Sequence, residues 1–321
     1  MEIQPVDFRL KYEVFNELGR GRFGVVLRCE EKKTQKQFAI KICKTLTQKA
    51  KNDIRRELDI MKRLDHHLFV RVYECFEFQK ETALIMELVK GGELFEKLVD
   101  PNYDLTELEC IRFIRQICLG AEYMHQRNIV HLDLKPENIL CTSVWSYNIK
   151  IVDFGLARRL DGDASIVRVL AGTPDFVSPE ILNYEPLTTR ADMWSIGVIT
   201  YVLLSGLSPF LGDTDAETLQ NVQKLAYYFD QESFSAVSLN SRCFIESLLQ
   251  LDASKRLTST QCLEHPWLVN EEKARNNSIA TENHKKYMAK KNWANLKNVL
   301  SASCGFKNLL VESNIGCVAN E

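Results

Sequence analysis

The pattern of apolar residues changes once along this chain, at Gly91-Gly92, and this change constrains the fold more than any other feature. Over residues 12–89, short apolar alternations rich in β-branched and aromatic side chains predict strands, interrupted by one amphipathic helix over 52–64. Beyond the two glycines, apolar residues recur at the spacing of helices. The sequence therefore predicts an α+β fold with two lobes: a small antiparallel sheet that carries one main helix, and a larger, mostly helical lobe.

The predicted helices have clear signatures. The helix of the small lobe presents one apolar face, made of Ile54, Leu58, Met61 and Leu64. Thr106 followed by Glu109 forms a capping box at the start of a long helix over 105–128. Further helices are predicted over 92–99, 192–205, 214–225, 241–249 and 258–263. We therefore divide the chain into an N-terminal extension (1–11), a small lobe (12–89), a large lobe (90–268) and a tail (269–321).

Composition excludes several classes of partner. The chain has 41 basic and 43 acidic residues and a net charge of −2, so no strong overall field attracts nucleic acid or an anionic membrane. The N-terminus lacks the apolar core of a secretion signal, and the longest apolar run, around 196–204, is too short to span a bilayer. Ten cysteines without a C-x-x-C pair favour buried thiols over a zinc site. We expect a soluble cytoplasmic protein.

A glycine-rich stretch, LGRGRFGVV, spans residues 18–26 and places Gly19, Gly21 and Gly24 in a G-x-G-x-x-G-x-V pattern. Glycines let backbone amides approach phosphate oxygens without a Cβ in the way. The residues that follow read as a strand rather than the helix that a dinucleotide-binding fold requires. The pattern therefore favours a hairpin over phosphates, with a purely structural hairpin as the alternative.

Lys41 lies in the middle of an apolar strand, FAIKIC, seventeen residues after Gly24. A lysine in such surroundings is costly to bury unless it is paired. Glu57 on the following helix can pair with it and hold the ammonium toward the phosphates of a nucleotide. The alternative is a surface lysine and an unrelated helix glutamate.

The stretch HLDLKPEN, residues 131–138, supplies a third set of polar groups. Asp133 can accept a hydrogen bond from an attacking hydroxyl, Lys135 can offset charge on a transferring phosphoryl group, and Asn138 can bind a metal through its amide oxygen. Asp153 follows an apolar strand in IKIVDFGLA, where its carboxylate can chelate magnesium. One carboxylate, one amide and ATP suffice for magnesium.

These elements, in this order, resemble the signatures of eukaryotic protein kinases over residues 12–268. The segment GTPDFVSPE at 172–180 resembles the substrate-receiving segment of that family, with Ser178 in place of the usual Ala. The resemblance implies an ion pair between Glu180 and Arg256 and a structural role for Asp192 beneath the catalytic loop. Lys135 together with Thr173 resembles the serine/threonine branch.

The resemblance implies ATP and Mg²⁺ as cofactors and assigns roles to named residues. Catalytic roles fall on Asp133, Lys135, Lys41 and Glu57, and metal binding falls on Asn138 and Asp153. Substrate binding falls on Glu93, Glu137 and Thr173. The hinge from Glu87 to Val89 is expected to bind adenine through its backbone. The residues expected around the nucleotide are Leu18, Gly19, Gly21, Gly24, Val26, Ala39, Lys41, Met86, Glu87, Val89 and Glu93.

Leu132 stands where many kinases of this pattern carry an arginine. That arginine is an uncompensated charge beside the catalytic Asp until a phosphorylated activation loop pairs with it. Ser165 and Thr173 lie in the corresponding loop, without an arginine at position 132 to receive a phosphate. We predict that loop phosphorylation is not the principal switch. The alternative is that Leu132 only packs in the core.

The tail carries a local basic patch, with six lysines and no acidic residue between Glu282 and Glu312: Lys285, Lys286, Lys290, Lys291, Lys297 and Lys307. Ala289, Trp293, Leu296 and Leu300 recur at helical spacing within it, as in calmodulin targets. Trp293, Leu300 and Phe306 fit a 1-8-14 anchor spacing, so residues 285–306 are predicted to bind calcium-calmodulin. The alternatives are a helix docked on the large lobe and a membrane-surface helix.

Several stretches, among them HLDLKPENIL and VDFGLARRL, resemble the myosin light chain kinase group most closely, with giant muscle-protein and death-associated kinases as near relatives. The predicted substrate is therefore a myosin regulatory light chain, and the predicted location is the actomyosin cytoskeleton. Glu93 and Glu137 suit basic residues upstream of the phosphoacceptor, so the lysine-rich tail is predicted to block the cleft. The rival hypotheses are a kinase with another cytoskeletal substrate, a pseudokinase scaffold and an interaction module.

Overall fold

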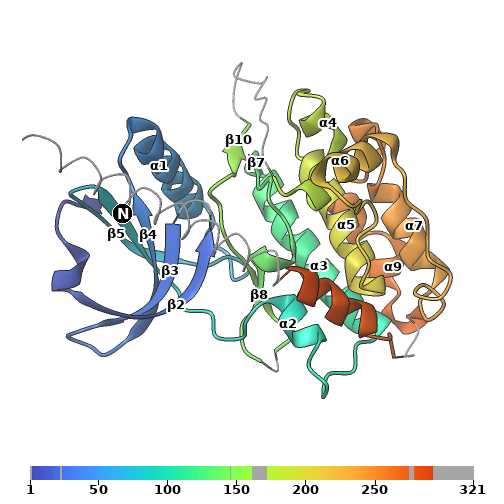
Figure 1. The fold of residues 1–321 in the computed structure, drawn as a ribbon, viewed down its shortest axis with the longest axis horizontal. Coiled ribbons are helices and arrows are strands. Elements are labelled where there is room, and N and C mark those ends of the chain that lie inside the picture. Colours follow the sequence, from blue (N-terminus) through green and yellow to red (C-terminus); the bar gives the residue numbers. More distant parts are fainter. Residues whose placement is uncertain (1, 22–23, 145, 161–171, 275–277, 292–321) are drawn as a thin grey trace, which may run out of the picture.

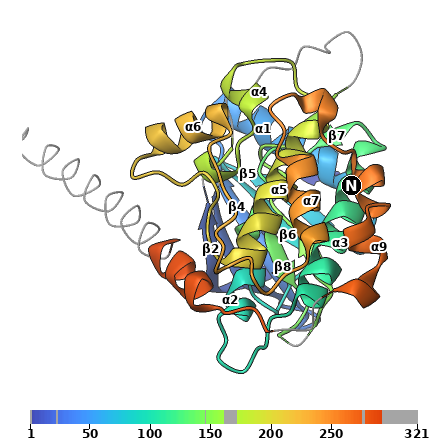
Figure 2. The same cartoon turned by 90° about the vertical axis from the view of Figure 1, so that its right-hand side faces the viewer.

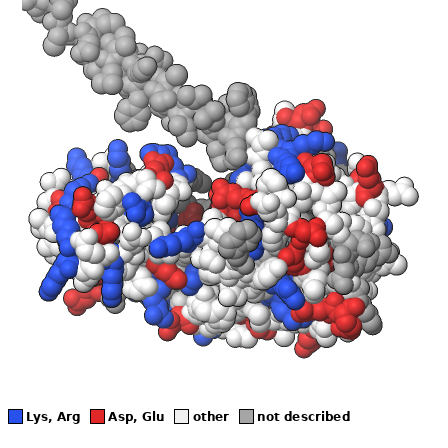
Figure 3. All heavy atoms as spheres, turned by 90° about the horizontal axis from the view of Figure 1, so that it is seen from below, with Lys and Arg blue, Asp and Glu red and all other residues white. Residues whose placement is uncertain are grey.

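The structure is a computed structural model that describes residues 2–21, 24–144, 146–160, 172–274 and 278–291. Figure 1 shows two lobes side by side, a sheet with one long helix and a larger body of helices. A hollow separates the lobes in the space-filling view of Figure 3, where basic and acidic side chains are interspersed. The predicted α+β, two-lobed architecture is confirmed.

The small lobe is built on a six-stranded sheet with the order β1-β5-β6-β4-β3-β2. All neighbouring strands are antiparallel except β1, which pairs in parallel with β5. Part of the stretch assigned from sequence to an N-terminal extension thus joins the sheet as an edge strand. The strands are β1 (Ile3–Gln4), β2 (Tyr12–Gly21), β3 (Gly24–Glu31), β4 (Gln37–Lys44), β5 (Val72–Phe78) and β6 (Glu81–Met86).

The main helix of the small lobe, α1, spans Gln48–Arg63 and starts four residues before its predicted start. The earlier start is explained by Thr47, whose side chain accepts a hydrogen bond from the Ala50 amide and caps the helix. All four predicted face residues are buried: Ile54, Leu58, Met61 and Leu64. Their burial fixes which side of α1 meets the sheet, and so where Glu57 points.

The large lobe is organised around α5 (Arg190–Ser205), which is buried along nearly its whole length. The other long helix, α3 (Glu107–His125), begins with the predicted capping box between Thr106 and Glu109. The remaining helices are α2 (Leu94–Leu98), α4 (Pro179–Leu182), α6 (Asp215–Lys224), α7 (Leu239–Leu248), α8 (Ser259–Leu263) and α9 (Pro266–Val269). Short 3-10 helices are η1 (Phe8–Leu10), η2 (Pro136–Asn138), η4 (Pro174–Phe176), η5 (Ala253–Lys255) and η6 (Glu271–Lys273).

Two short antiparallel pairs of strands lie in the large lobe, in the part of the chain between α3 and residues 172–180. They are β7 (Ile129–Val130) with β10 (Arg158–Arg159), and β8 (Ile139–Cys141) with β9 (Ile149–Ile151). The polar stretch 131–138 connects β7 to β8, and Asp153 follows β9. The strands therefore bring the two polar motifs of the sequence to the same region.

The tail returns to the large lobe. Ser278 forms an antiparallel bridge with Thr106, and residues 282–291 are helical. This helix lies beside α2 in Figures 1 and 2. Its contacts with the large lobe include those of Asn283, His284, Tyr287, Met288 and Lys291.

The state of the cysteines agrees with the expectation of buried thiols. The cysteines at described positions are free, and all of them are buried except Cys243. No helix in these ranges combines the length and apolar character needed to cross a bilayer.

Candidate active site

The loop 131–138 is anchored by Asp192, a fully buried residue in the first turn of α5. Its carboxylate accepts hydrogen bonds from the amides of His131 and Leu132, each at 2.9 Å, and lies 2.9 Å from His125 Nε2. Burial acts to raise the pKa of Asp192, but these hydrogen bonds outweigh it and hold the pKa below its usual range. The structural role expected of Asp192 is confirmed.

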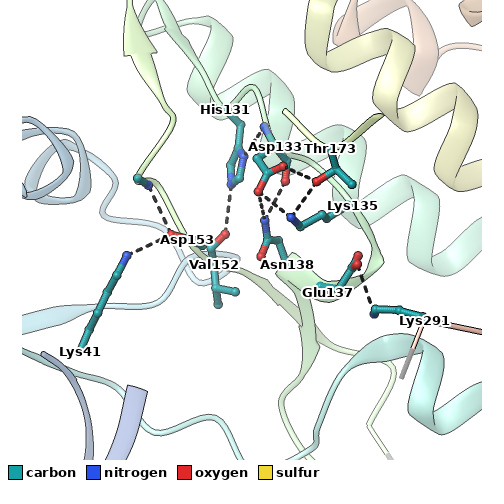
Figure 4. A network of polar contacts seen from close by, with 11 residues as sticks. Lys41, His131, Asp133, Lys135, Glu137, Asn138, Val152, Asp153, Thr173 and Lys291 are labelled. Carbon is teal, nitrogen blue, oxygen red and sulfur yellow. Dashed lines mark hydrogen bonds and ion pairs between the residues drawn. The ribbon is translucent and has the colours of Figure 1, made fainter. Parts of the chain in front are cut away.

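Three polar side chains converge on the carboxylate of Asp133, as Figure 4 shows. Thr173 Oγ1 donates to Asp133 Oδ1 at 3.0 Å, and Lys135 Nζ lies 2.9 Å from Asp133 Oδ2. Lys135 also donates to Thr173 Oγ1 at 2.9 Å. Asn138 Nδ2 donates to the Asp133 carbonyl at 2.7 Å and to its Oδ2 at 3.1 Å. The structure thus brings together residues that lie 40 positions apart in the chain.

The amide of Asn138 is oriented by these bonds. Because its nitrogen donates twice to Asp133, its oxygen remains available as a ligand. Lys135 keeps its charge: burial lowers its pKa, but Asp133 outweighs burial and raises it. The loop therefore presents one carboxylate, one ammonium and one amide oxygen to the space between the lobes.

Lys41 of β4 forms an ion pair with Glu57 of α1 at 2.6 Å and a second one with Asp153 at 3.0 Å. Lys41 and Glu57 are 7% and 2% exposed, so the alternative of a surface lysine is wrong. Burial lowers the pKa of Lys41, but the two carboxylates outweigh it and keep the ammonium charged. Because Asp153 belongs to the large lobe, this ammonium also joins the two lobes electrostatically.

Asp153 adopts a left-handed backbone conformation, with φ of +63°. Phe154, which follows it, is buried against Phe69 and His131, with ring centroids 5.8 and 5.0 Å apart. Burial acts to raise the pKa of Asp153, but Lys41 outweighs burial and lowers it. The packed phenylalanine therefore holds an ionised carboxylate at the cleft.

A magnesium ion fits the donors of this site. The ionised Asp153 and the free amide oxygen of Asn138 are both hard oxygen ligands, and magnesium needs few protein ligands because it keeps waters and binds phosphates. No group of three or more His, Cys, Asp or Glu suited to a metal occurs among the described residues. The donor set is therefore suited to a metal that arrives with a nucleotide.

The three glycines of the β2–β3 hairpin have different surroundings. A Cβ on Gly24 would lie 2.3 Å from the Ile42 carbonyl oxygen, so Gly24 lets β3 approach β4 closely. A Cβ on Gly19 or Gly21 would meet no atom within 4 Å. Packing therefore accounts for Gly24 only, and the other two glycines leave room for a ligand.

The expected nucleotide-facing residues lie on adjacent strands and at the hinge. Ala39 pairs with Met86 across β4 and β6, and Val26 pairs with Lys41. The Glu87 amide donates to the Arg71 carbonyl at 2.9 Å and is thus not available to a nucleotide. This leaves the Glu87 carbonyl and the backbone of Val89 as hinge groups for adenine. Leu18, on β2, is 47% exposed.

The two glutamates expected to read basic substrate residues bind a lysine of the tail instead. Lys291 Nζ lies 2.9 Å from Glu93 Oε2 and 3.4 Å from Glu137 Oε1. Figure 4 shows Lys291 directed toward Glu137. Burial raises the pKa of Glu93, and Lys291 partly offsets this.

Leu132 packs in a small apolar cluster and is 5% exposed. The other buried members are Val130, Val177, Ile181, Leu187 and Ala191. Packing is therefore part of the explanation for Leu132. Because its side chain is uncharged, Leu132 also places no charge beside Asp133. Thr173 contacts Lys135 and Asp133, whereas Ser165 lies outside the described residues.

The expected ion pair between Glu180 and Arg256 is confirmed. Arg256 donates from both terminal nitrogens to the two carboxylate oxygens of Glu180, each at 2.7 Å, and both residues are buried. Arg256 also lies 5.1 Å from the ring of Trp194. The pair ties the end of the segment 172–180 to the core of the large lobe.

The tail helix packs on the large lobe through residues that the sequence interpretation missed. His284 is fully buried and its Nε2 lies 2.9 Å from the Leu203 carbonyl, while Tyr287 packs on Phe95 with ring centroids 5.7 Å apart. With Met288 and Lys291, these residues follow the i, i+3, i+4, i+7 spacing of one helix face, which the sequence displays. Ala289, assigned to the calmodulin stripe, is exposed, and Trp293, Leu300 and Phe306 lie outside the described residues.

Comparisons with known proteins agree with this geometry. Residues 12–268 match the protein kinase domain. The chain is 48% identical over 283 residues to the smooth-muscle myosin light chain kinase of Gallus gallus, covering 88% of this chain and 15% of that protein. It is 45% identical over 296 residues to myosin light chain kinase 2 (skeletal/cardiac muscle) of Rattus norvegicus, covering 91% and 48%. The chain therefore spans about half or less of the length of these curated relatives.

Two solved structures have the same fold. A twitchin kinase fragment of C. elegans, described as an autoregulated protein kinase with immunoglobulin domains, superposes with a TM-score of 0.85 at 40% identity, covering 91% of this chain and 66% of that one. The autoinhibited serine kinase domain of titin gives a TM-score of 0.79 at 32% identity, with 87% of each chain covered.

Proposed function

The chain belongs to the protein kinase family, within the serine/threonine kinases of the myosin light chain kinase group, and on that premise we propose that it phosphorylates a myosin regulatory light chain and is held inactive by its own tail. The observation that supports both parts is the placement of Lys291 on Glu93 and Glu137. Those glutamates suit basic residues upstream of a phosphoacceptor, and a lysine of the same chain occupies them.

The catalytic part of the proposal follows from the contacts of Asp133. Its Oδ1 accepts one hydrogen bond from the described residues, from Thr173, and has a second lone pair for the hydroxyl of a substrate. We assign Asp133 the orientation of that hydroxyl and the acceptance of its proton. Lys135 stabilises the charge of the phosphoryl group. Thr173 fixes the positions of Lys135 and Asp133 relative to each other, because its hydroxyl is hydrogen-bonded to both.

The nucleotide is assigned to the cleft on the small-lobe side. Lys41 is held by Glu57 and directed at the phosphates, with Gly19 and Gly21 leaving room above them. When bound, magnesium supplies positive charge between phosphate oxygens, and Asp153 with Asn138 would hold it. Because every group that phosphoryl transfer needs is present and oriented, the geometry disfavours a pseudokinase scaffold.

The regulatory part of the proposal rests on tethering. A segment of the same chain meets the cleft at roughly millimolar effective concentration, so a few contacts suffice to block it. We propose that residues 269–321 form the regulatory tail and that calcium-calmodulin binds about residues 285–306 and withdraws Lys291. The twitchin and titin kinases are described as autoregulated and autoinhibited, which supports a similar device here.

Two classes of protein substrate are weighed for this chain. Identity to myosin light chain kinases reaches 48%, against 40% for the twitchin fragment, and this favours a light chain over another cytoskeletal protein. We propose a cytoplasmic location on the actomyosin cytoskeleton for the same reason. A giant muscle-protein kinase with a different substrate is the second candidate, supported by the similarity of fold to the twitchin and titin kinases.

The proposal is tested by measuring phosphate transfer from MgATP to a purified myosin regulatory light chain and to a generic basic serine peptide, with and without calcium-calmodulin. Transfer to the light chain that rises on adding calcium-calmodulin is the expected result, and Asp133→Asn serves as the inactive control. Transfer to the peptide without transfer to the light chain would contradict the proposal that a light chain is the substrate. Equal activity in both conditions would contradict the tail switch.

A further inference from the structure

The tail is attached to the large lobe by a short stretch of paired backbone ahead of the helix at 282–291. The Ile279 amide donates to the Leu105 carbonyl at 2.7 Å, and Ser278 forms an antiparallel bridge with Thr106. The side chain of Ile279 is 3% exposed. This attachment fixes where the helix begins and therefore whether Lys291 reaches the cleft.

An exposed hydroxyl group lies at this attachment. Ser278 is exposed, and its Oγ donates to the carboxylate of Asp104, which is exposed as well. Asp104 forms no ion pair within the described part of the chain. The contact thus joins the neutral hydroxyl of Ser278 to the carboxylate of Asp104. A modifying enzyme can reach the hydroxyl once the backbone pairing opens.

The carboxylate of Asp104 lies directly against Ser278. Glu107 and Glu109 lie in the first turn of α3, directly after the Asp104–Thr106 stretch. A helix N-terminus attracts anions, but the capping box engages two amides here: the Glu109 amide binds Thr106 Oγ1, and the Thr106 amide binds Glu109 Oε2. A new anion at Ser278 would therefore meet Asp104 without a free donor from the capping box.

We propose that Ser278 is a phosphorylation site and that a phosphate there detaches the tail. A phosphoserine carries about −1.5 to −2 charges and cannot donate the hydrogen bond that Ser278 now gives to Asp104. Repulsion between the two anions opens the pairing at Ile279, and Lys291 leaves Glu93 and Glu137. The modified protein is then active without calcium-calmodulin.

The kinase that modifies Ser278 is the chain itself, and this step rests on the proposed function. Arg275 stands three residues before Ser278, which is the upstream basic residue that Glu93 and Glu137 suit. In the transfer, the bond between the γ-phosphorus of ATP and its bridging oxygen breaks and a bond from Ser278 Oγ to phosphorus forms. The hydroxyl proton passes to Asp133, and ADP leaves.

The order of events follows from the docked geometry. A substrate segment must extend into the cleft, whereas Ile279 is buried and its amide is bonded to Leu105. Ser278 can therefore be modified only after the tail has been withdrawn. The phosphate then prevents the tail from docking again, so activity outlasts the calcium signal.

The test compares 321-residue chains that carry phosphoserine, installed during synthesis, at position 278 or at position 254. Ser254 is the matched control because it is exposed and also donates to an aspartate, Asp252, at 2.7 Å, but lies on η5 away from the tail. We expect phosphoserine at 278 to raise transfer to a basic serine peptide, without calcium-calmodulin, by about fivefold or more, and phosphoserine at 254 to leave it unchanged. Equal activity of all forms would overturn the inference.

Two further arms separate this inference from the proposed function. Lys291→Ala removes the cleft contact directly: if it raises activity and phosphoserine at 278 does not, the tail inhibits but Ser278 does not control it. If neither raises activity, the autoinhibition itself is wrong.

Mass spectrometry after incubation with MgATP and calcium-calmodulin should find phosphate on Ser278, and Ser278→Ala should abolish the activity that persists after calcium removal. Absence of phosphate on Ser278 would overturn the assignment of the chain as its own kinase.

Discussion

Lys291, in the tail helix, forms an ion pair with Glu93 at the start of α2, with 2.9 Å between Nζ and Oε2. Glu137 lies 3.4 Å from the same ammonium and belongs to the loop that carries Asp133. The lysine is 13% exposed in its side chain, so it is largely withdrawn from water. The contact therefore places a tail residue next to the catalytic loop, and it makes the tail testable by single substitutions.

Lys291→Ala should raise basal activity. Removing an ammonium that bridges two part-buried carboxylates costs the docked tail about 1.5 kcal/mol, which corresponds to roughly tenfold in the docking equilibrium. We expect kcat/KM for a basic peptide without calcium-calmodulin to rise by a similar factor. Lys286→Ala, an exposed lysine on the same helix, should leave the activity unchanged. An equal rise in activity for both substitutions would mean that the overall positive charge of the tail, rather than the contact of Lys291, inhibits the enzyme.

Gly206→Ala should release the tail from its other end. A Cβ on Gly206 would lie 2.4 Å from the His284 amide nitrogen, and Gly206 has φ of +69°, so alanine is unfavourable there by roughly 1–2 kcal/mol. We expect higher basal activity and a slightly lower melting temperature. Adding Lys291→Ala should give little further activation, because both substitutions remove the same docked state. Full additivity in the double variant would contradict this.

Docking of the tail should weaken at acidic pH because of His284. Burial lowers the pKa of this imidazole, so the docked state favours its neutral form. The stabilisation from the neutral ring is present above the unfolded pKa of about 6.5 and is lost as pH falls through the lower pKa of the docked state. Hydrogen exchange at 279–291, corrected for intrinsic rates, should show lower protection at pH 6 than at pH 7.5.

The matched comparison for this pH effect is His284→Gln. The acidic residues around the tail helix are the same in both proteins, so their contribution cancels in the comparison. We expect the protection of the glutamine variant to vary less with pH than that of the unsubstituted chain. An identical pH dependence in the two proteins would show that another group controls docking.

Thr173→Ala should lower kcat by about tenfold with little change in KM for ATP, because Thr173 positions Asp133 and Lys135 and is not assigned to nucleotide binding. Thr173→Ser retains the hydroxyl and should restore most of the activity. Initial rates with a basic peptide provide the measurement. A fall in affinity for ATP with unchanged kcat would assign Thr173 a different role.

Glu180→Ala should destabilise the large lobe by about 3–5 kcal/mol, since it leaves the guanidinium of Arg256 buried without its carboxylate. Urea unfolding measures this loss. Glu185→Ala, at an exposed position in the following turn, should change stability by less than about 0.5 kcal/mol. A small effect at Glu180 would mean that the carbonyl oxygens around Arg256 suffice to hold it.

Much of the small lobe could be predicted from local pattern, whereas its edge could not. The apolar face of α1 and the alternation of the strands are periodic signals that depend on neighbours a few residues away. β1 has only two residues and pairs in parallel with β5 across about 70 positions, which no local pattern indicates. The start of α1 was missed because its first turn is polar and is defined by the cap at Thr47.

The sequence by itself determined which residue types are present and in which order, and these residues carry the prediction that Lys41, Asp133, Asn138 and Asp153 serve phosphate and metal. Only the tertiary structure decided which of these groups touch. Thr173 joins Asp133, and Lys291 joins Glu93, because the packing of α5 and of the tail brings distant segments together. Residue identity fixes charge and donor capacity, but the distances on which catalysis and inhibition depend come from the burial of apolar side chains along the whole chain.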